Sequence, residues 1–250
     1  MMTKIKTQTE INDMRKSGSI LASVLDEVEK YLKPGVTTDE LNLVAAKKLK
    51  KLGGQPAFLG YYGFPAVICI SVNEEVVHGI PGKRIIKNGD IVSLDFGVKY
   101  NGMITDAART VLVGGGINKA KMQLIAGTLE SLDAGISKVK AGARVGDLSS
   151  AIQSVLDEYG YGIVRDLVGH GVGHELHEDP NIPNYGKAST GPVLEAGMTI
   201  AIEPMATQGS YKVYTADDGW TILTQDGSMA AHFEDTILVT DDGFEILTRH

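Results

Sequence analysis

The sequence predicts an α+β fold made of two halves that face each other. Two observations predict it: helices and strands alternate twice along the chain, and short motifs recur at a nearly constant distance. Apolar residues recur at helical spacing in four segments, at 10–32, 38–52, 119–139 and 146–159. Strand-rich sequence follows each pair of helices, at 65–72, 91–98 and 103–113 in the first half and at 162–168, 198–203, 221–225 and 233–239 in the second. A repeated order of helices followed by strands is typical of an α+β arrangement.

The recurring motifs place the boundary between the halves. "KPGVTTDEL" (33–41) resembles "KAGARVGDL" (140–148), and their shared glycines lie 107 residues apart. "NGDIVSLD" (88–95) resembles "AGMTIAIE" (196–203) with an offset of 108 residues. Chance explains any one match, whereas a nearly constant offset favours two related halves. We therefore expect a single domain over residues 1–250, with halves at about 1–113 and 114–250.

Composition and charge narrow the class of protein. The 250 residues carry a formal net charge of −7, which argues against nucleic acid as a partner because that needs a basic surface. Cys69 is the single cysteine, so no internal disulfide can form, which suits a reducing compartment. The start of the chain lacks a signal-peptide pattern, and no segment is apolar over the length of a bilayer. We expect a cytoplasmic protein that binds neither nucleic acid nor membrane.

The segment 92–113 predicts a β-hairpin that carries two carboxylates on one face. Asn101-Gly102 is typical of a two-residue turn, and this turn makes opposed residue numbers sum to 203. In that register Asp95 and Asp106 are diagonal neighbours on one face, with Cα atoms roughly 7–8 Å apart. Two ionised carboxylates on an apolar sheet repel each other and lose hydration, so a proton or a cation must compensate them.

Two further acids complete a set of four. Glu203 ends the apolar run "GMTIAIE", at the position that the internal repeat relates to Asp95. Glu234 stands just before a β-branched run, as Asp106 stands before "TVLV". Each acid alone is typical of an exposed strand end. Four acids at related places in two halves instead indicate one shared site.

The segment "LVGHGVGHELHEDP" supplies a nitrogen donor. It is not a zincin helix, because His174 and His177 are three residues apart rather than four. The glycines around His170 predict close backbone approach, and beside four inward carboxylates this histidine is a candidate metal ligand. One charge from each of the four acids totals −4, which matches two divalent cations. Such a site favours Mn²⁺, Fe²⁺ or Co²⁺, with Zn²⁺ as an alternative, and two ions can activate a bridging water for hydrolysis.

The chain resembles the type I methionine aminopeptidases through five ordered motifs, namely "GFPAVICISVNEEVVHGIPG", "LDFGVKYNGMITDAARTVLVG", "GHGVGHELHEDP", "GMTIAIEPM" and "DGWTILTQDGSMAAHFEDTILVT". The resemblance implies the pita-bread fold shared with prolidase and creatinase, in which helices pack outside a curved, mainly antiparallel sheet. It places the family's metal ligands on Asp95, Asp106, His170, Glu203 and Glu234. These are the same five residues that the charge count and the internal repeat indicate. Asp235 departs from the family, where many members have histidine, but it is not a ligand position.

The resemblance also implies a reaction, the hydrolytic removal of the initiator methionine from nascent proteins and peptides whose second residue is small. A metal-bridged hydroxide would attack the scissile carbonyl, with Glu203 as general base. His177 would stabilise the tetrahedral intermediate, and His78 would contact the first peptide nitrogen and assist proton transfer. Around the methionine side chain the family's pocket positions fall on Phe58, Tyr61, Phe64, Cys69, Leu176, His177 and Trp220, with His78 at the rim. Phe64 and Leu176 replace the tyrosine and phenylalanine of some members, which leaves the fine selectivity open.

Two other functions stay open at this level. An Xaa-Pro aminopeptidase or prolidase shares the fold, but those enzymes usually add an N-terminal domain and further histidines. A non-catalytic peptide-binding module on this fold has typically lost ligands, whereas all five positions are retained here. The resemblance further implies a catalytic monomer whose partner is the N-terminal methionine of nascent polypeptides, with transient ribosome contact through the body of the domain.

Overall fold

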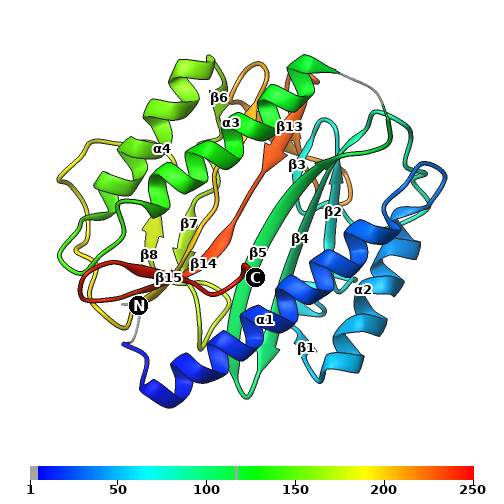
Figure 1. Ribbon diagram of the computed structural model, residues 1–250. Helices are drawn as coiled ribbons and strands as arrows, with labels where there is room; N and C mark the ends of the chain where they lie inside the picture. Colours follow the sequence, from blue (N-terminus) through cyan, green and yellow to red (C-terminus); the bar gives the residue numbers. More distant parts are fainter. Residues whose placement is uncertain (1–4, 116–117) are drawn as a thin grey trace.

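Four α-helices form within the residues that the structure describes, 5–115 and 118–250, in this computed structural model (Figure 1). They are α1 (Gln8–Tyr31), α2 (Thr38–Leu52), α3 (Lys119–Ile136) and α4 (Val145–Tyr159), with a 3₁₀ turn, η1 (Tyr61–Gly63). The predicted helices are confirmed, with ends that differ by at most three residues. None of the helices in these ranges is long and apolar enough to cross a membrane.

The strands form four sheets, and every strand pairing in the described residues is antiparallel. In the first half the strands are β1 (Gln55–Pro56), β2 (Cys69–Val72), β3 (Glu75–Val77), β4 (Ile91–Tyr100) and β5 (Met103–Leu112). In the second half they are β6 (Gly162–Ile163), β7 (Gly169–Gly171), β8 (Glu178–Ile182), β9 (Thr199–Ile202), β10 (Met205–Thr207), β11 (Val213–Thr215), β12 (Ile222–Thr224), β13 (Ala230–His232), β14 (Asp235–Val239) and β15 (Phe244–Ile246). The sheet orders are β1-β4-β2 with β5 on β4, β13-β10-β6, β11-β12-β3 and β15-β14-β9-β7-β8.

The long hairpin of β4 and β5 has the predicted register. Asp95 pairs with Ala108, and Asp106 pairs with Gly97. Both turn residues adopt the left-handed conformation, with φ of 48° and 89°, as this type of two-residue turn requires. The register therefore places both acids on one face of the hairpin, as the sequence predicts.

The helices cover the strands in two groups. Figure 1 shows α1 crossing the β4–β5 hairpin, while α3 and α4 lie side by side over the second-half strands. One apolar core lies beneath α1 and α2 and includes Leu21, Leu25 and Phe96, and another lies beneath α3 and α4. A backbone bridge between Ala108 and Glu234 joins the first-half hairpin to second-half strands. The architecture is the expected α+β arrangement with helices outside antiparallel sheets.

Two of the strand predictions were too long. The expected strand at 65–72 begins only at Cys69, because Pro65 has no N–H and the Val67 N–H donates to Asn42 Oδ1 on α2 at 3.1 Å. The expected strand at 162–168 is limited to β6, after which the chain makes one further backbone bond, from the Val164 N–H to the Met205 carbonyl at 3.1 Å. The first segment is kept out of the sheet by a contact with α2, whereas the second makes one last bond to its partner strand β10 and then leaves the pairing.

Candidate metal centre and adjoining pocket

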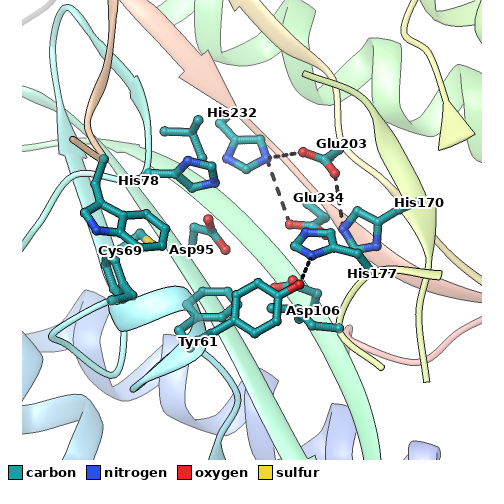
Figure 2. Close-up of a pocket in the computed structure, with 15 residues that line it drawn as sticks. Tyr61, Cys69, His78, Asp95, Asp106, His170, His177, Glu203, His232 and Glu234 are labelled. Atoms are coloured by element: carbon teal, nitrogen blue, oxygen red, sulfur yellow. Dashed lines mark hydrogen bonds and ion pairs between the residues drawn. The ribbon is translucent and has the colours of Figure 1, made fainter. Parts of the chain in front are cut away.

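One cavity, lined from both halves of the chain, brings together every residue that the sequence singles out (Figure 2). Its polar lining holds Asp95, Asp106, Glu203, Glu234, His78, His170 and His177. Its other lining residues among the candidates are Phe58, Tyr61, Phe64, Cys69, Leu176 and Trp220. The cavity thus has an acidic end and an apolar end.

The acidic end is built from strands that are far apart in sequence. Asp95 and Asp106 come from β4 and β5, His170 comes from β7, Glu203 follows β9, and Glu234 lies between β13 and β14. Donor atoms of Asp106, His170 and Glu234 lie within 4.8 Å of one another. His170 Nε2 lies 3.4 Å from Glu203 Oε1. Carboxylate oxygens and an imidazole nitrogen therefore point into one small volume, as the ligands of a metal ion do.

Backbone contacts hold the second-half donors against the hairpin. The Ala108 and Glu234 backbones exchange hydrogen bonds of 3.2 and 3.0 Å, which fixes Glu234 beside β5. The Thr236 hydroxyl accepts from the Asp106 N–H at 2.9 Å and donates to the Asp106 carbonyl at 2.8 Å, which latches β14 onto the same strand. The position of Glu234 is therefore set by the hairpin that carries Asp106.

His170 is placed by the close backbone approach that its glycines predict. A Cβ on Gly169 would lie 2.4 Å from the Ala201 carbonyl oxygen, so only glycine lets β7 pack this closely on β9. His170 Nδ1 lies 2.9 Å from the Gly171 carbonyl and can only donate to it. This bond leaves the Nε2 lone pair free toward Glu203, which is the orientation of a ligating histidine. Residues 172–177 form no helix, so the rejection of a zincin motif is confirmed.

The electrostatics of the acidic end favour a bound cation. Burial, and then the neighbouring charges, raises the pKa of Asp95, Glu203 and Glu234 well above the usual range, and burial raises the pKa of Asp106 to about 7. Burial lowers the pKa of His170 to about 3, so its imidazole is neutral. Buried oxygens of Asp95, Asp106 and Glu234 have no hydrogen-bond partner in the described part of the chain. Unpaired anionic oxygens beside a neutral imidazole fit divalent cations better than any partner that the chain itself offers.

Two more histidines flank the centre. His177 Nδ1 lies 2.8 Å from the Tyr61 hydroxyl, and its ring centre is 4.3 Å from that of His170. His78 adopts a left-handed backbone conformation with φ of 61°, a strained state for a non-glycine residue. Burial lowers the pKa of His177 and lowers the pKa of His78 to about 4. Both rings are neutral at pH 7 and can exchange protons with a molecule in the cavity.

The apolar end is a slot of aromatic, aliphatic and sulfur-containing side chains. The Phe64 and Trp220 rings meet edge to face at a centroid distance of 5.1 Å. Cys69 pairs with Asp95 across β2 and β4, and burial raises the pKa of its thiol well above its usual value. An uncharged thiol beside aromatic faces suits an apolar, polarisable side chain.

The cavity also contains two residues that the sequence reasoning missed, Val77 and His232. His232 is 1% exposed, and its Nε2 lies 3.8 Å from Glu203 Oε2 and 3.9 Å from Glu234 Oε2. Burial, and to a smaller extent the nearby His78, lowers the pKa of His232 to about 3. A histidine two residues before a candidate ligand in strand-rich sequence is the signal that could have found it.

This fold and this site define a class of protein, the metal-dependent hydrolases that act on a substrate held beside a carboxylate-rich centre. Metallopeptidase family M24 matches residues 12–241, and the chain belongs to that family. The match covers both helix pairs and all five candidate ligands, and it confirms the resemblance drawn from the motifs.

Relatives within the family narrow the group further. The chain is 50% identical over 248 residues to a methionine aminopeptidase of Clostridium acetobutylicum, a match that covers 99% of each chain. It is 49% identical to the crystal structure of methionine aminopeptidase from Thermotoga maritima, with a TM-score of 0.97 and full coverage of both chains. A prolidase from Pyrococcus furiosus is more distant, at 28% identity and a TM-score of 0.79, and the match covers 65% of that chain.

Proposed function

We propose that this chain removes the N-terminal methionine of peptides and nascent proteins whose second residue is small. One observation carries the proposal: an acidic centre and a slot rich in aromatic residues share one cavity. An aminopeptidase needs both, because the slot must hold the first side chain while the centre acts on the peptide bond that follows it. The methionine aminopeptidases that match the whole chain support the same substrate class.

The ligands of the centre would be Asp95, Asp106, His170, Glu203 and Glu234. Their four negative charges match two divalent ions, and their carboxylate-rich character suits Mn²⁺, Fe²⁺ or Co²⁺, with Zn²⁺ as an alternative. When bound, the ions would supply an activated water and polarise the scissile carbonyl. The β4–β5 hairpin and the hydrogen bonds between Thr236 and the Asp106 backbone hold Asp95 and Asp106 in place before any substrate binds.

Three side chains would move or hold protons. Glu203 is the general base, because its buried carboxylate has a raised pKa that suits it to accept a proton from the attacking water. His177 donates a hydrogen bond to the carbonyl oxygen as negative charge develops there, and Tyr61 orients its ring through Nδ1. His78 contacts the first peptide nitrogen and assists its protonation.

The methionine side chain would lie in the slot formed by the lining residues Phe58, Tyr61, Phe64, Cys69, Leu176 and Trp220. Contacts between a thioether and aromatic rings contribute roughly 0.3–1.5 kcal/mol each. Several such contacts favour methionine over a branched side chain of similar size.

One domain of two related halves, about 1–113 and 114–250, would carry this activity. Residues 1–4 and 116–117 of those ranges lie outside the described residues. Two local features recur in both halves with the same spacing as the sequence motifs. A glycine in the left-handed conformation ends a helix at Gly53 and again at Gly160, and an isolated β-bridge forms at Thr37 and again at Arg144. We further propose a cytoplasmic monomer that contacts the ribosome transiently through the body of the domain.

A reconstitution assay tests the function. The protein is stripped with chelator, supplied with Mn²⁺, Co²⁺, Fe²⁺ or Zn²⁺, and assayed for methionine release from Met-Ala-Ser and Met-Leu-Ser. We expect metal-dependent cleavage of Met-Ala-Ser only, which Glu203→Ala abolishes and His174→Gln, outside the cavity, does not. Cleavage of an Xaa-Pro peptide instead would favour a prolidase-like enzyme. Peptide binding without cleavage would favour a binding module.

A further inference from the structure

We infer that His232 is a further metal ligand, which adds a second imidazole nitrogen to the five proposed donors. The inference rests on the proposed metal centre and deepens it. Nothing in the sequence motifs assigns a role to this residue, and the proposed reaction does not use it.

The first support is that the His232 ring is buried and unpaired. Its side chain is 1% exposed, and neither Nδ1 nor Nε2 has a hydrogen-bond partner in residues 5–115 and 118–250. Buried polar groups are nearly always paired, so both nitrogens require a partner in the working protein. A neutral imidazole has one nitrogen with a lone pair to offer.

The second support is the spacing of the donor atoms. The distances of 3.8 and 3.9 Å from His232 Nε2 to Glu203 Oε2 and Glu234 Oε2 are too long for hydrogen bonds. Two donors that each lie about 2.1 Å from one ion are separated by roughly 3.0–4.2 Å, depending on the angle between them. The His170 Nε2 to Glu203 Oε1 distance of 3.4 Å falls in the same range.

The third support is the direction from which His232 approaches. Figure 2 shows the Glu203 carboxylate between two imidazole rings. Its Oε1 faces His170 Nε2 and its Oε2 faces His232 Nε2. Because each oxygen of one carboxylate faces its own nitrogen donor, the two histidines serve different sides of the centre.

The backbone fixes His232 in this position. Its N–H donates to Thr110 Oγ1 at 2.9 Å, and its carbonyl accepts from the same hydroxyl at 2.6 Å. The residue also pairs with Met205 across β10 and β13. The side chain is therefore held rigidly against the centre, as a ligand must be.

A second nitrogen changes which ions the centre prefers. Imidazole ligands suit Zn²⁺, Fe²⁺ and Ni²⁺, whereas a carboxylate-only environment suits Mn²⁺. We expect His232→Gln to bind Co²⁺ and Zn²⁺ about tenfold or more weakly than the wild type, and to bind Mn²⁺ within about threefold. His174→Gln, which removes a histidine outside the cavity, should bind all three ions as the wild type does.

Competition titrations against a chromophoric chelator measure these affinities, and proton NMR of the Co²⁺-loaded wild type counts the ligands directly. Each Co²⁺-bound imidazole contributes one strongly shifted, solvent-exchangeable N–H resonance, so two are expected in the wild type and one in His232→Gln. A single resonance in the wild type, or equal Co²⁺ affinity for the wild type and the folded variant, would overturn the inference and leave the proposed function standing. Failure of the wild type to bind any of the three ions would overturn both. If His232→Gln does not fold, the wild-type count alone decides.

Discussion

The two ends of the cavity differ in whether the chain completes them. At the apolar end, Phe64 and Trp220 pack edge to face, and Cys69 is buried among carbon atoms, so these groups are satisfied by the protein itself. At the acidic end, Asp95, Asp106 and Glu234 each leave a buried oxygen without a partner in the described residues. One end is ready to receive an apolar side chain, while the other leaves buried carboxyl oxygens that cations would complete.

The difference assigns the two ends separate tasks in the reaction. An apolar slot can contribute to substrate and transition state equally, which changes KM more than kcat. The acidic end acts where charge and protons move, so changes there should appear mainly in kcat. Substitutions at the two ends can therefore test whether the two tasks are separate.

The largest effect is expected from Glu203→Gln at the acidic end. The amide keeps the size of the side chain but cannot accept the proton of the attacking water. We expect kcat for Met-Ala-Ser to fall about 10²- to 10⁴-fold with little change in KM. Steady-state kinetics on the metal-loaded variant measure both constants. A rise in KM with kcat preserved would show that Glu203 only helps to hold the substrate.

A smaller effect is expected from Phe64→Leu at the apolar end. Leucine keeps the slot apolar but removes the edge-to-face contact with Trp220 and one aromatic face for the thioether. These contacts are worth about 0.5–1.5 kcal/mol, so KM should rise roughly 2- to 12-fold while kcat stays the same. The same kinetics test it, and an unchanged KM with a lower kcat would contradict the division between the two ends.

An effect of similar size, but on kcat, is expected from Tyr61→Phe, where the two ends meet. The change removes the 2.8 Å hydrogen bond to His177 Nδ1 but keeps the ring in the slot. A hydrogen bond of this kind contributes about 0.5–1.5 kcal/mol net, so kcat should fall roughly 2- to 12-fold with KM unchanged. The double variant with His177→Gln tests whether Tyr61 acts through His177. Because the imidazole is then absent, adding Tyr61→Phe should not lower kcat any further.

The first-half part of the centre could be predicted from sequence because its causes are local. An Asn-Gly turn determines the register of β4 and β5, and the register places Asp95 and Asp106 on one face. Helix ends were predictable for the same reason, since a threonine cap with a glutamate three residues later begins α2 and a left-handed glycine ends it.

The part of the metal centre that comes from the second half of the chain depends on tertiary contacts, so the sequence predicted it only in outline. His170 lies on a three-residue strand between glycines. The glycines indicate a close backbone approach, but no local pattern indicates that the partner of Gly169 is the Ala201 carbonyl. His232 lies inside the last of the five motifs, but the sequence reasoning gave it no role. Its approach to Glu203 follows from strand pairing between β10 and β13, which the sequence does not specify.

The central claim, that the acidic end is complete only with cations, can be tested through the pH dependence of stability. Above about pH 7.5 an ordinary histidine is almost entirely neutral in the unfolded chain, and the histidines of the cavity, with lowered pKa values, are neutral in the folded protein as well. The carboxyl groups of the acidic end are then the groups whose protonation differs between the two states. Their folded-state pKa values are raised, with that of Asp106 at about 7. The metal-free folded protein therefore binds more protons than the unfolded chain, and its stability should fall as the pH rises.

Thermal unfolding of the metal-free and the Mn²⁺-loaded protein between pH 7.5 and 9 is the measurement to make. The account predicts that the Tm of the metal-free protein falls steadily over this range, while the Tm of the loaded protein does not fall and lies higher throughout. With the ion at about 100 times its Kd, the stabilisation would be about 2.7 kcal/mol, or roughly 5–11 °C in Tm. Identical pH profiles with and without Mn²⁺ would contradict the claim that cations complete the acidic end.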